Sequence, residues 1–240
     1  MSIHPLLSRA RGLWEDLAHV PVSFPPAGGV KVAVSPESGL CPAGWVGMVA
    51  LGESAIVTVP TESTATFVRD ALVGLPAQAI VDGTSVRTVL PIARTLGPAA
   101  LSYVSADGFR PVQTGTRTLE QLPAGHPDLR RLEESAGEED AGEAGMDEIT
   151  SPAFVVREHD QVVAAAGYRG WPSLTAHIGV LTAPAQRGQG LARITASAAV
   201  VHALATGLLP QWRARPLASR RVAASLGFEE LGFQLSIEIV

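Results

Sequence analysis

The stretch A-H-I-G-V-L-T-A-P-A-Q-R-G-Q-G-L-A at residues 176–192 has the residue types and spacing to bind an anion. Its apolar opening predicts a strand, and its last residues predict the start of a helix. A strand that enters a helix through such a loop leaves the first helical N–H groups without partners, at the positive end of the helix dipole. Arg187 can add charge-assisted hydrogen bonds, while Gly188 and Gly190 allow close approach to the backbone. We therefore predict a phosphate site at this loop.

Three side chains around this stretch could move a proton. His177 lies on the predicted strand, and an ordinary histidine pKa of about 6.5 suits a general base, although a histidine on a strand is more often structural or exposed. Tyr168 ends the preceding strand and could donate a proton or line a pocket. Glu158 is a third candidate, with a solvated hairpin end as its alternative. Alternation places His177, Gly179 and Leu181 on one face of the strand, which leaves open whether that face meets a ligand.

The second half of the chain predicts a hairpin, a third strand and then alternating helices and strands. We expect strands at residues 154–157, 162–168, 176–182 and 208–214, helices at 191–204 and 218–226, an extended segment at 228–240, and a first strand at 112–119. A β-α-β-α-β order after a hairpin predicts a mixed, mostly antiparallel twisted sheet flanked by helices, which is an α/β (α+β) fold.

The first half predicts a related order of elements. We expect helices at residues 6–17, 61–72 and 85–96, and strands at 30–34, 46–51, 55–59 and 100–104. Thr61 is the expected N-cap of its helix, and the loop before it contains neither arginine nor glycine. The turn-rich residues 105–115 mark a boundary near Gly108. We therefore expect an N-terminal α/β region at 1–107 and a second domain at 108–240, and the order strand, strand, helix recurs in both.

Three segments together resemble the GNAT N-acetyltransferase superfamily. R-G-Q-G-L-A at Arg187–Ala192 is similar to its acetyl-CoA pyrophosphate loop, R-x-x-G-x-G/A. V-L-T-x-P at Val180–Pro184 is similar to the end of its splayed strand, and S-x-x-x-x-x-x-L-G-F at Ser219–Phe228 is similar to its second CoA-side motif. The resemblance covers residues 110–240 and implies a GNAT-like fold there. It makes the N-terminal half a candidate degenerate GNAT-like copy that has lost the phosphate loop.

The resemblance also implies an activity and a set of site residues. Acetyl-CoA would be the cosubstrate, and its acetyl group would pass directly to a primary amine. The residues carried over for cofactor binding are Val180, Leu181, Thr182, Arg187, Gly188, Gln189, Gly190, Leu191, Ala192 and Ser219. A backbone N–H near Val180 or Leu181 would stabilise the oxyanion. His177 lies on the strand where many relatives carry a glutamate base.

Two positions depart from the family pattern. Pro216 replaces a frequent asparagine, and Ala223 replaces a tyrosine that can protonate the departing thiolate. Alanine cannot donate a proton, so Tyr168 becomes the replacement acid that we expect, with His177 as the base. The alternative to an enzyme is a non-catalytic acyl-CoA-binding sensor or interaction module. A Rossmann dinucleotide site is disfavoured because G-x-G-x-x-G is absent.

Composition limits the partners. A net charge of -5 disfavours nucleic acid, and one cysteine excludes an internal disulfide framework. The histidines lack metal-ligand spacing, so no metal is expected.

No secretory signal or long apolar run is evident, which predicts a soluble, cytoplasmic protein without a membrane partner. A small-molecule or peptide amine is the expected acceptor, and a homodimer stays open. Eight acidic residues at 133–148 form either a solvated linker or a rim that attracts a cationic amine.

Overall fold

The computed structural model describes residues 4–240, which divide into two compact units. The first unit runs to Ser102 and also takes in Glu230–Val240, while the second comprises Tyr103–Glu229. The sequence placed a single boundary at residues 107/108, and the first three residues of that N-terminal region lie outside the described part. The last strand of the chain therefore belongs to the same unit as the N-terminal strands.

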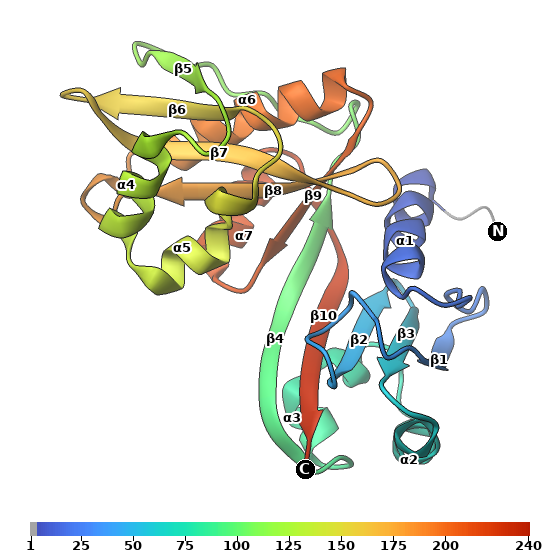
Figure 1. The fold of residues 1–240 in the computed structure, drawn as a ribbon. Coiled ribbons are helices and arrows are strands. Elements are labelled where there is room, and N and C mark those ends of the chain that lie inside the picture. Colours follow the sequence, from blue (N-terminus) through green and yellow to red (C-terminus); the bar gives the residue numbers. More distant parts are fainter. Residues whose placement is uncertain (1–3) are drawn as a thin grey trace. The chain divides into compact units, whose positions relative to one another are not determined.

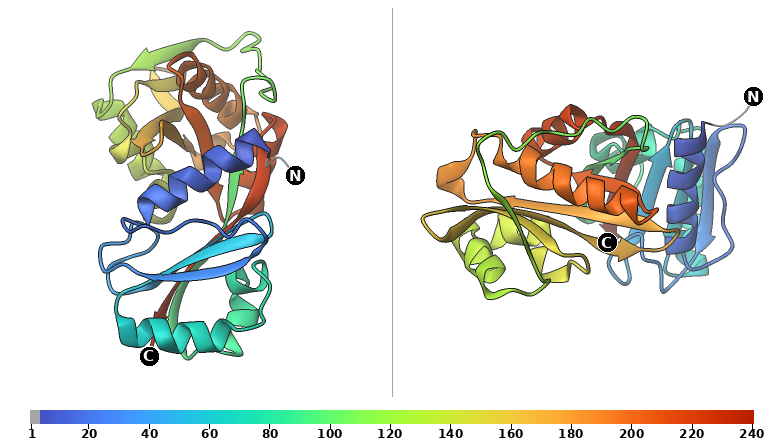
Figure 2. Two further views of the ribbon diagram at one scale, coloured as in Figure 1. Left: turned by 90° about the vertical axis from the view of Figure 1, so that its right-hand side faces the viewer. Right: turned by 90° about the horizontal axis from the view of Figure 1, so that it is seen from above.

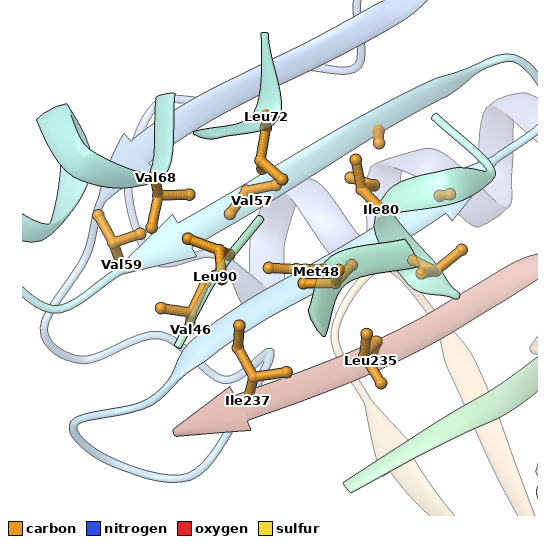
Figure 3. Packing of buried hydrophobic residues seen from close by; sticks show 14 of the residues in the cluster. Val46, Met48, Val57, Val59, Val68, Leu72, Ile80, Leu90, Leu235 and Ile237 are labelled. Carbon is orange, nitrogen blue, oxygen red and sulfur yellow. The ribbon is translucent and has the colours of Figure 1, made fainter. Parts of the chain in front are cut away.

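The first unit has a five-stranded sheet in the order β1-β3-β2-β10-β4 (Figure 1). Its elements are α1 Pro5–Leu17, β1 Gly29–Val34, β2 Val46–Leu51, β3 Ser54–Val59, α2 Glu62–Leu72, η1 Ala79–Val81, α3 Gly83–Arg87, β4 Ile92–Tyr103 and β10 Glu229–Ile239. Strands β2 and β3 are buried along their whole length, which matches their continuous apolar sequence. Figure 3 shows Leu235 and Ile237 of β10 beside Met48 and Val46 of β2 in the core of this unit.

The second unit has a sheet in the order β9-β8-β7-β6-β5. Its elements are β5 Leu119–Leu122, α4 Pro127–Ala136, α5 Glu138–Ala144, η2 Met146–Glu148, β6 Ala153–Glu158, β7 Gln161–Trp171, β8 Thr175–Thr182, η3 Pro184–Gln186, α6 Leu191–Ala205, β9 Leu209–Ala214 and α7 Leu217–Ser225. Neighbouring strands from β5 to β8 are antiparallel, and β9 is parallel to β8. Helices α4 and α5 cover one face of this sheet, and α6 covers the other (Figure 2).

The expected fold class is confirmed. Both units are mixed α/β, with mostly antiparallel strands flanked by helices. The hairpin of residues 154–168, the strand at 176–182, the helix from Leu191 and the N-cap at Thr61 all lie where the sequence predicted them. No helix in the described part of the chain combines the length and the apolar character needed to cross a membrane.

Three expectations about individual elements were wrong. The helix expected at residues 85–96 ends at Arg87, because Pro91 cannot continue a helix and the chain enters β4 directly after it. The strand expected at 112–119 begins only at Leu119, since the Val112 N–H donates to Ser197 Oγ of α6 (2.9 Å) instead of to a strand. The acidic stretch 133–148 is not a linker, because it forms the end of α4 and all of α5 and η2.

Candidate functional site

The parallel pair β8 and β9 separates partway along its length. The two strands are in register only at Thr175–Leu209, Ala176–Pro210 and His177–Gln211. Strand β8 continues to Thr182 and β9 to Ala214 without further registered pairs. A gap therefore opens between the strands beyond His177 and Gln211, and we call it the fork. Backbone groups that face the fork have no strand partner on that side.

Two hydrogen bonds show which residues of β8 face the fork. The Ala183 N–H donates to Val163 O on the β7 side (2.9 Å), and Leu174 O accepts from the Leu209 N–H on the β9 side (2.8 Å). The N–H and C=O of one strand residue point to the same neighbouring strand, and successive residues alternate. Because the register with β7 is unbroken, Val180 and Thr182 direct their N–H and C=O groups into the fork. The Thr182 hydroxyl oxygen is also buried and has no partner within the described chain.

The loop after β8 provides further unused donors. Gly190 is the N-cap of α6 with φ of 78°, and no side chain caps the helix. Gly188 has φ of 81°, so both glycines occupy a backbone region that other residues rarely adopt. Within residues 4–240, none of the N–H groups from Gly188 to Ala192 donates to the protein. A helix N-terminus with free donors favours an anion.

Arg187 is already engaged in an ion pair. Its Nη2 donates to Asp140 Oδ2 of α5 (2.6 Å), and the two side chains are 50% and 46% exposed. Its Nε lies 3.4 Å from Thr182 O. Gln189 points elsewhere, because its side chain accepts from Arg117 (2.8 Å) and donates to Gln186. Arg187 therefore lies at the site with its guanidinium paired to Asp140, and the Gln189 side chain stabilises the loop through its hydrogen bonds to Arg117 and Gln186.

A cavity of about 420 Å³ joins the fork to the loop. It is lined by Asp140, Glu143, Ala144, Ile178, Val180, Leu181, Thr182, Gln186, Arg187, Gly188, Gly190, Leu191, Ala192, Arg193, Trp212, Arg213, Pro216, Ala218, Ser219 and Val222. Nine of the ten residues predicted to bind the cofactor are among them, and Gln189 is the exception. The structure thus brings the three sequence segments together around one hollow.

Helix α5 covers one side of the cavity because Gly179 lets it pack closely on β8. A Cβ at Gly179 would lie 2.3 Å from Ala144 O, so a larger residue would displace the end of α5. Glu143 of α5 accepts from Arg215 Nε (3.1 Å) at the end of β9. Burial opposes ionisation of Glu143, but the hydrogen bonds and charge of Arg215 outweigh it and lower the pKa of that carboxyl. The helix is therefore held to both strand ends by ion pairs.

His177 lies at the base of the fork, on the strand face that α5 covers. Its Nδ1 is hydrogen-bonded to Oε1 of the fully buried Gln211, and its ring stacks on Trp171 with 4.1 Å between centroids. An amide oxygen can only accept, so this contact places the proton on Nδ1 and the lone pair on Nε2. Burial, reinforced by the charge of Arg213, lowers the pKa of His177 to about 4. The ordinary pKa assumed from the sequence is therefore wrong, and the ring is neutral at pH 7.

Tyr168 does not reach the cavity, which corrects the role predicted for it as an acid or a lining residue. It is paired with Ile178 across β7 and β8, and both residues pack under α6. The Tyr168 side chain is 6% exposed, and its hydroxyl is hydrogen-bonded to His202 Nδ1 of α6 (2.9 Å). His177 and Tyr168 thus face opposite sides of the sheet. The third candidate, Glu158, is ion-paired with Arg117 outside the cavity lining.

Comparisons with known proteins agree with this geometry. Residues 151–232 match the GNAT acetyltransferase family. Residues 151–232 therefore correspond to a GNAT acetyltransferase domain. The resemblance predicted from the loop and strand motifs is thereby confirmed, whereas a GNAT-like origin of the N-terminal half stays a prediction. A comparison with curated proteins finds no significant match.

Several solved structures are similar to this chain. An acetyltransferase of the GNAT family from Colwellia psychrerythraea is similar with a TM-score of 0.50 and 14% identity over 100% of this chain and 98% of that one. A GNAT-family protein from Novosphingobium aromaticivorans has a TM-score of 0.44 and 19% identity over 61% of this chain and 65% of that one, so under two thirds of its length is matched. An acetyltransferase from Salmonella typhimurium, solved with its cofactor acetyl-CoA, has a TM-score of 0.39 and 18% identity over 50% and 91%.

The cavity is also lined by residues that the motifs did not reveal. Arg213 on β9 and Glu143 on α5 line the cavity, and neither belongs to a matched motif. Ser219 was expected to contact the cofactor side or to cap its helix, but Pro216 is the N-cap and Ser219 accepts from the Trp212 indole N–H (3.0 Å). Trp212 therefore closes the cavity wall while its ring packs edge-on against Phe228. Alternation along the short strand 208–214 was the only available signal for Arg213.

Among residues 4–240, no three side chains of His, Cys, Asp or Glu come together as metal ligands would.

Proposed function

We propose that the second unit transfers the acetyl group of acetyl-CoA to an amine. The observation that carries this proposal is the meeting of two sets of unused backbone donors in one cavity. One set faces the fork from Val180 and Thr182, and the other lies at Gly188–Ala192 at the start of α6. The first suits the amide groups of a pantetheine chain, and the second suits a pyrophosphate.

Acetyl-CoA fits the chemistry of the residues present. Val180 and Thr182 offer alternating N–H and C=O groups to a chain that lies along the strand edge, much as another strand would. The buried Thr182 hydroxyl lacks a protein partner, and a buried polar atom normally has one. Arg187 adds a cation beside the loop. The thioester supplies the activated acetyl group, and every other contribution comes from the protein.

Proton handling falls to His177 and the backbone in this proposal. The ammonium group of the acceptor first loses one proton, and the neutral amine attacks the carbonyl carbon. The C–S bond then breaks, the nitrogen of the new C–N bond gives up a second proton, and the sulfur leaves as a thiolate that takes up one proton. The Val180 N–H points into the fork and is the donor we assign to the oxyanion, in preference to Leu181, whose N–H faces β7. The lone pair on His177 Nε2 accepts the proton of the amine directly or through water.

Neither side chain considered from the sequence for protonation of the thiolate can serve. Ala223 is 1% exposed and cannot donate, and Tyr168 is under α6. The hydroxyl that lines the cavity from α7 is Ser219, which accepts a hydrogen bond from Trp212 and so keeps its own proton available. We assign Ser219 to hydrogen bonding of the departing sulfur, with solvent as the proton source.

The vacant acid position also favours a second candidate function. A protein that keeps the phosphate loop and the fork but lacks a proton donor could bind acyl-CoA as a sensor without turnover. This reading shares every binding residue with the enzyme and differs only in whether amines react.

One experiment separates the two functions. The full chain is incubated with acetyl-CoA and a panel of primary amines, and both free CoA thiol and acetylated amine are measured, with amine-free reactions as the control for hydrolysis. Calorimetry measures CoA binding in parallel. Amine-dependent formation of both products supports the transferase. Tight CoA binding without product supports the sensor, and absence of CoA binding contradicts both.

A further inference from the structure

Arg213 of β9 places a cation in the wall of the cavity. It lies two residues beyond Gln211, the last residue of β9 in register with β8. A strand advances about 3.3 Å per residue with alternating faces, so Arg213 follows Gln211 on the same face about 7 Å further along. That face also carries His177, the registered partner of Gln211. The guanidinium and the imidazole therefore face one space beneath α5.

The environment of Arg213 is that of a cleft. Its side chain is solvent-exposed, yet the surrounding protein lowers the pKa of its guanidinium through desolvation. A cation that solvent reaches but that protein surrounds lies in a recess. An anionic ligand gains more electrostatic binding free energy there than on an open surface. The same field acts on His177, since Arg213 is the largest charge contribution that lowers its pKa.

Carboxylates at the cavity are already matched by other arginines. Asp140 is ion-paired with Arg187, and Glu143 is ion-paired with Arg215. Neither is therefore left to attract a cationic amine, which was one interpretation of the acidic stretch. Arg187 lies in the phosphate loop and Arg193 in the first turn of α6, so both belong to the cofactor end of the cavity. Arg213 is the cavity arginine on the opposite strand.

We propose that the acceptor is a free amino acid, whose carboxylate binds Arg213 while its amine lies at His177. This inference rests on the proposed acetyl transfer and names its substrate class. A planar guanidinium binds a carboxylate through paired hydrogen bonds, which fixes the orientation of the ligand. A carboxylate a few bonds from the amine matches the short separation of Arg213 and His177 along one face. A polyamine or an arylalkylamine lacks the group that this arginine recognises.

Binding of a carboxylate would also change the base. The charged groups facing His177 are Arg213 from β9, Arg169 from β7 with its partner Glu148 from η2, and Glu143 from α5. An anion on Arg213 offsets the positive charge that opposes protonation of the ring. The acceptor would therefore raise the pKa of His177 toward its ordinary value and make the imidazole a better proton acceptor when the amine is present.

The test compares α-amino acids with the amines that remain when their carboxylate is removed, such as phenylalanine with phenethylamine and methionine with 3-methylthiopropylamine. Acetylation rates are measured for the full chain and for the Arg213→Gln and Arg213→Lys variants. Arg221→Gln is the matched control, since it removes the same charge from an exposed residue of α7 outside the cavity lining. We expect kcat/KM for amino acids to exceed that for their decarboxylated partners by at least about tenfold. Arg213→Gln should abolish that preference, Arg213→Lys should restore part of it, and Arg221→Gln should leave it unchanged.

Binding measurements keep the inference testable if turnover is slow. Calorimetry with CoA-saturated protein should detect amino acids and lose them in Arg213→Gln, and the NMR titration of His177 should move to higher pH when an amino acid is bound. Equal rates for amino acids and simple amines would overturn the inference and leave the transferase intact. A loss of CoA affinity in Arg213→Gln would instead assign this arginine to the cofactor. CoA binding without acetylation of any amine and without amino-acid binding would overturn the transferase and the inference together.

Discussion

Each unit contains a parallel strand pair, and one strand of each pair leads into a helix. The two pairs differ in how far along their length the strands stay in register. In the first unit, β1 and β3 are in register at six positions, from Gly29–Ser54 to Val34–Val59. In the second, β8 and β9 separate after three. The helix after β3 begins at Thr61, whose side chain accepts from the Thr64 N–H (3.2 Å), whereas α6 begins at Gly190 without a side-chain cap.

This difference shows that the candidate site is built from backbone groups that the protein does not satisfy by itself. In the first unit the β1–β3 pair stays in register and the helix is capped by Thr61, so the protein itself satisfies these backbone groups. A hollow of about 720 Å³ does exist between β1 and the end of α2, and it is larger than the cavity of about 420 Å³ in the second unit. Volume therefore does not identify the site, whereas the unpaired edge and the uncapped helix do.

The largest expected effect comes from removing the titratable group at the fork. Neither β1 nor β3 contains a histidine, so His177→Ala makes the fork resemble the β1–β3 pair in this respect. We expect the acetyl-transfer rate to fall by about 10²-fold or more, the usual contribution of a positioned general base, with CoA affinity nearly unchanged. Single-turnover rates and calorimetry measure the two. His159→Asn, in an exposed turn, is the control, and a full rate in His177→Ala would make His177 structural.

The pH dependence of stability gives a second readout of the same residue. Folding lowers the pKa of His177 to about 4, while the unfolded chain has the ordinary value of about 6.5. Between these values the unfolded state binds a proton that the folded state does not. The stability due to neutral His177 is therefore complete above pH 6.5 and is lost as the pH falls toward 4. Denaturant titrations at several pH values should show a flatter acid limb in His177→Ala than in the wild type. The His177-dependent limb of the kcat/KM profile, which reports the protein without bound acceptor, should lie near pH 4.

The next effect concerns the glycines that leave the start of α6 open. Replacing Gly188 and Gly190 together with valine forces two β-branched residues to positive φ and moves the free N–H groups. We expect the dissociation constant for CoA to rise by at least about tenfold, equivalent to about 1.4 kcal/mol. Gly207→Val is the matched control, because it has φ of 77° at the other end of the same helix. Equal CoA affinity in the loop variant and the wild type would remove the loop from the site.

A smaller effect is expected at the capped helix of the first unit. Thr61→Ala removes the side-chain acceptor from the Thr64 N–H, and loss of such a cap costs about 1 kcal/mol of stability. CoA affinity should not change, since this helix start is satisfied without a ligand. Chemical denaturation measures the first effect and calorimetry the second, with Thr66→Ala in the exposed middle of α2 as the control. A weaker CoA affinity in Thr61→Ala would mean that the two helix starts are not functionally distinct.

The sequence predicted the elements and the set of residues that line the cavity because both depend on local patterns. The strand at 176–182, the loop and the helix from Leu191 follow from short-range periodicity and glycine placement, and nine of the ten proposed residues line one cavity. The facing of Val180 into the fork could not be predicted, since it depends on which strand pairs on each side.

The acid and base candidates were less accessible to sequence reasoning. The pKa of His177 depends on burial and on Arg213, which is 36 positions away in the chain, so an isolated motif could not reveal it. Tyr168 fails as an acid because alternation places it under α6, opposite His177. The strand expected at 112–119 failed for a similar reason, since a serine on a distant helix takes the Val112 N–H.

The smallest expected change in CoA affinity concerns the Arg187–Asp140 ion pair beside the uncapped start of α6. Asp140 occupies Arg187 and also places a negative charge beside the loop where a phosphate would bind. Both side chains are about half exposed, and such pairs contribute about 0–1 kcal/mol, so we expect Asp140→Asn to tighten CoA binding about threefold and Arg187→Ala to weaken it by a similar factor. In the double variant the gain from Asp140→Asn should shrink, because the arginine that it releases is gone, and all three effects should diminish at high salt. Glu138→Gln is the control, since it removes the same charge from an exposed position of α5 outside the cavity lining. Calorimetry at two salt concentrations measures the cycle, and strictly additive changes would mean that Asp140 acts on the phosphate site without acting through Arg187.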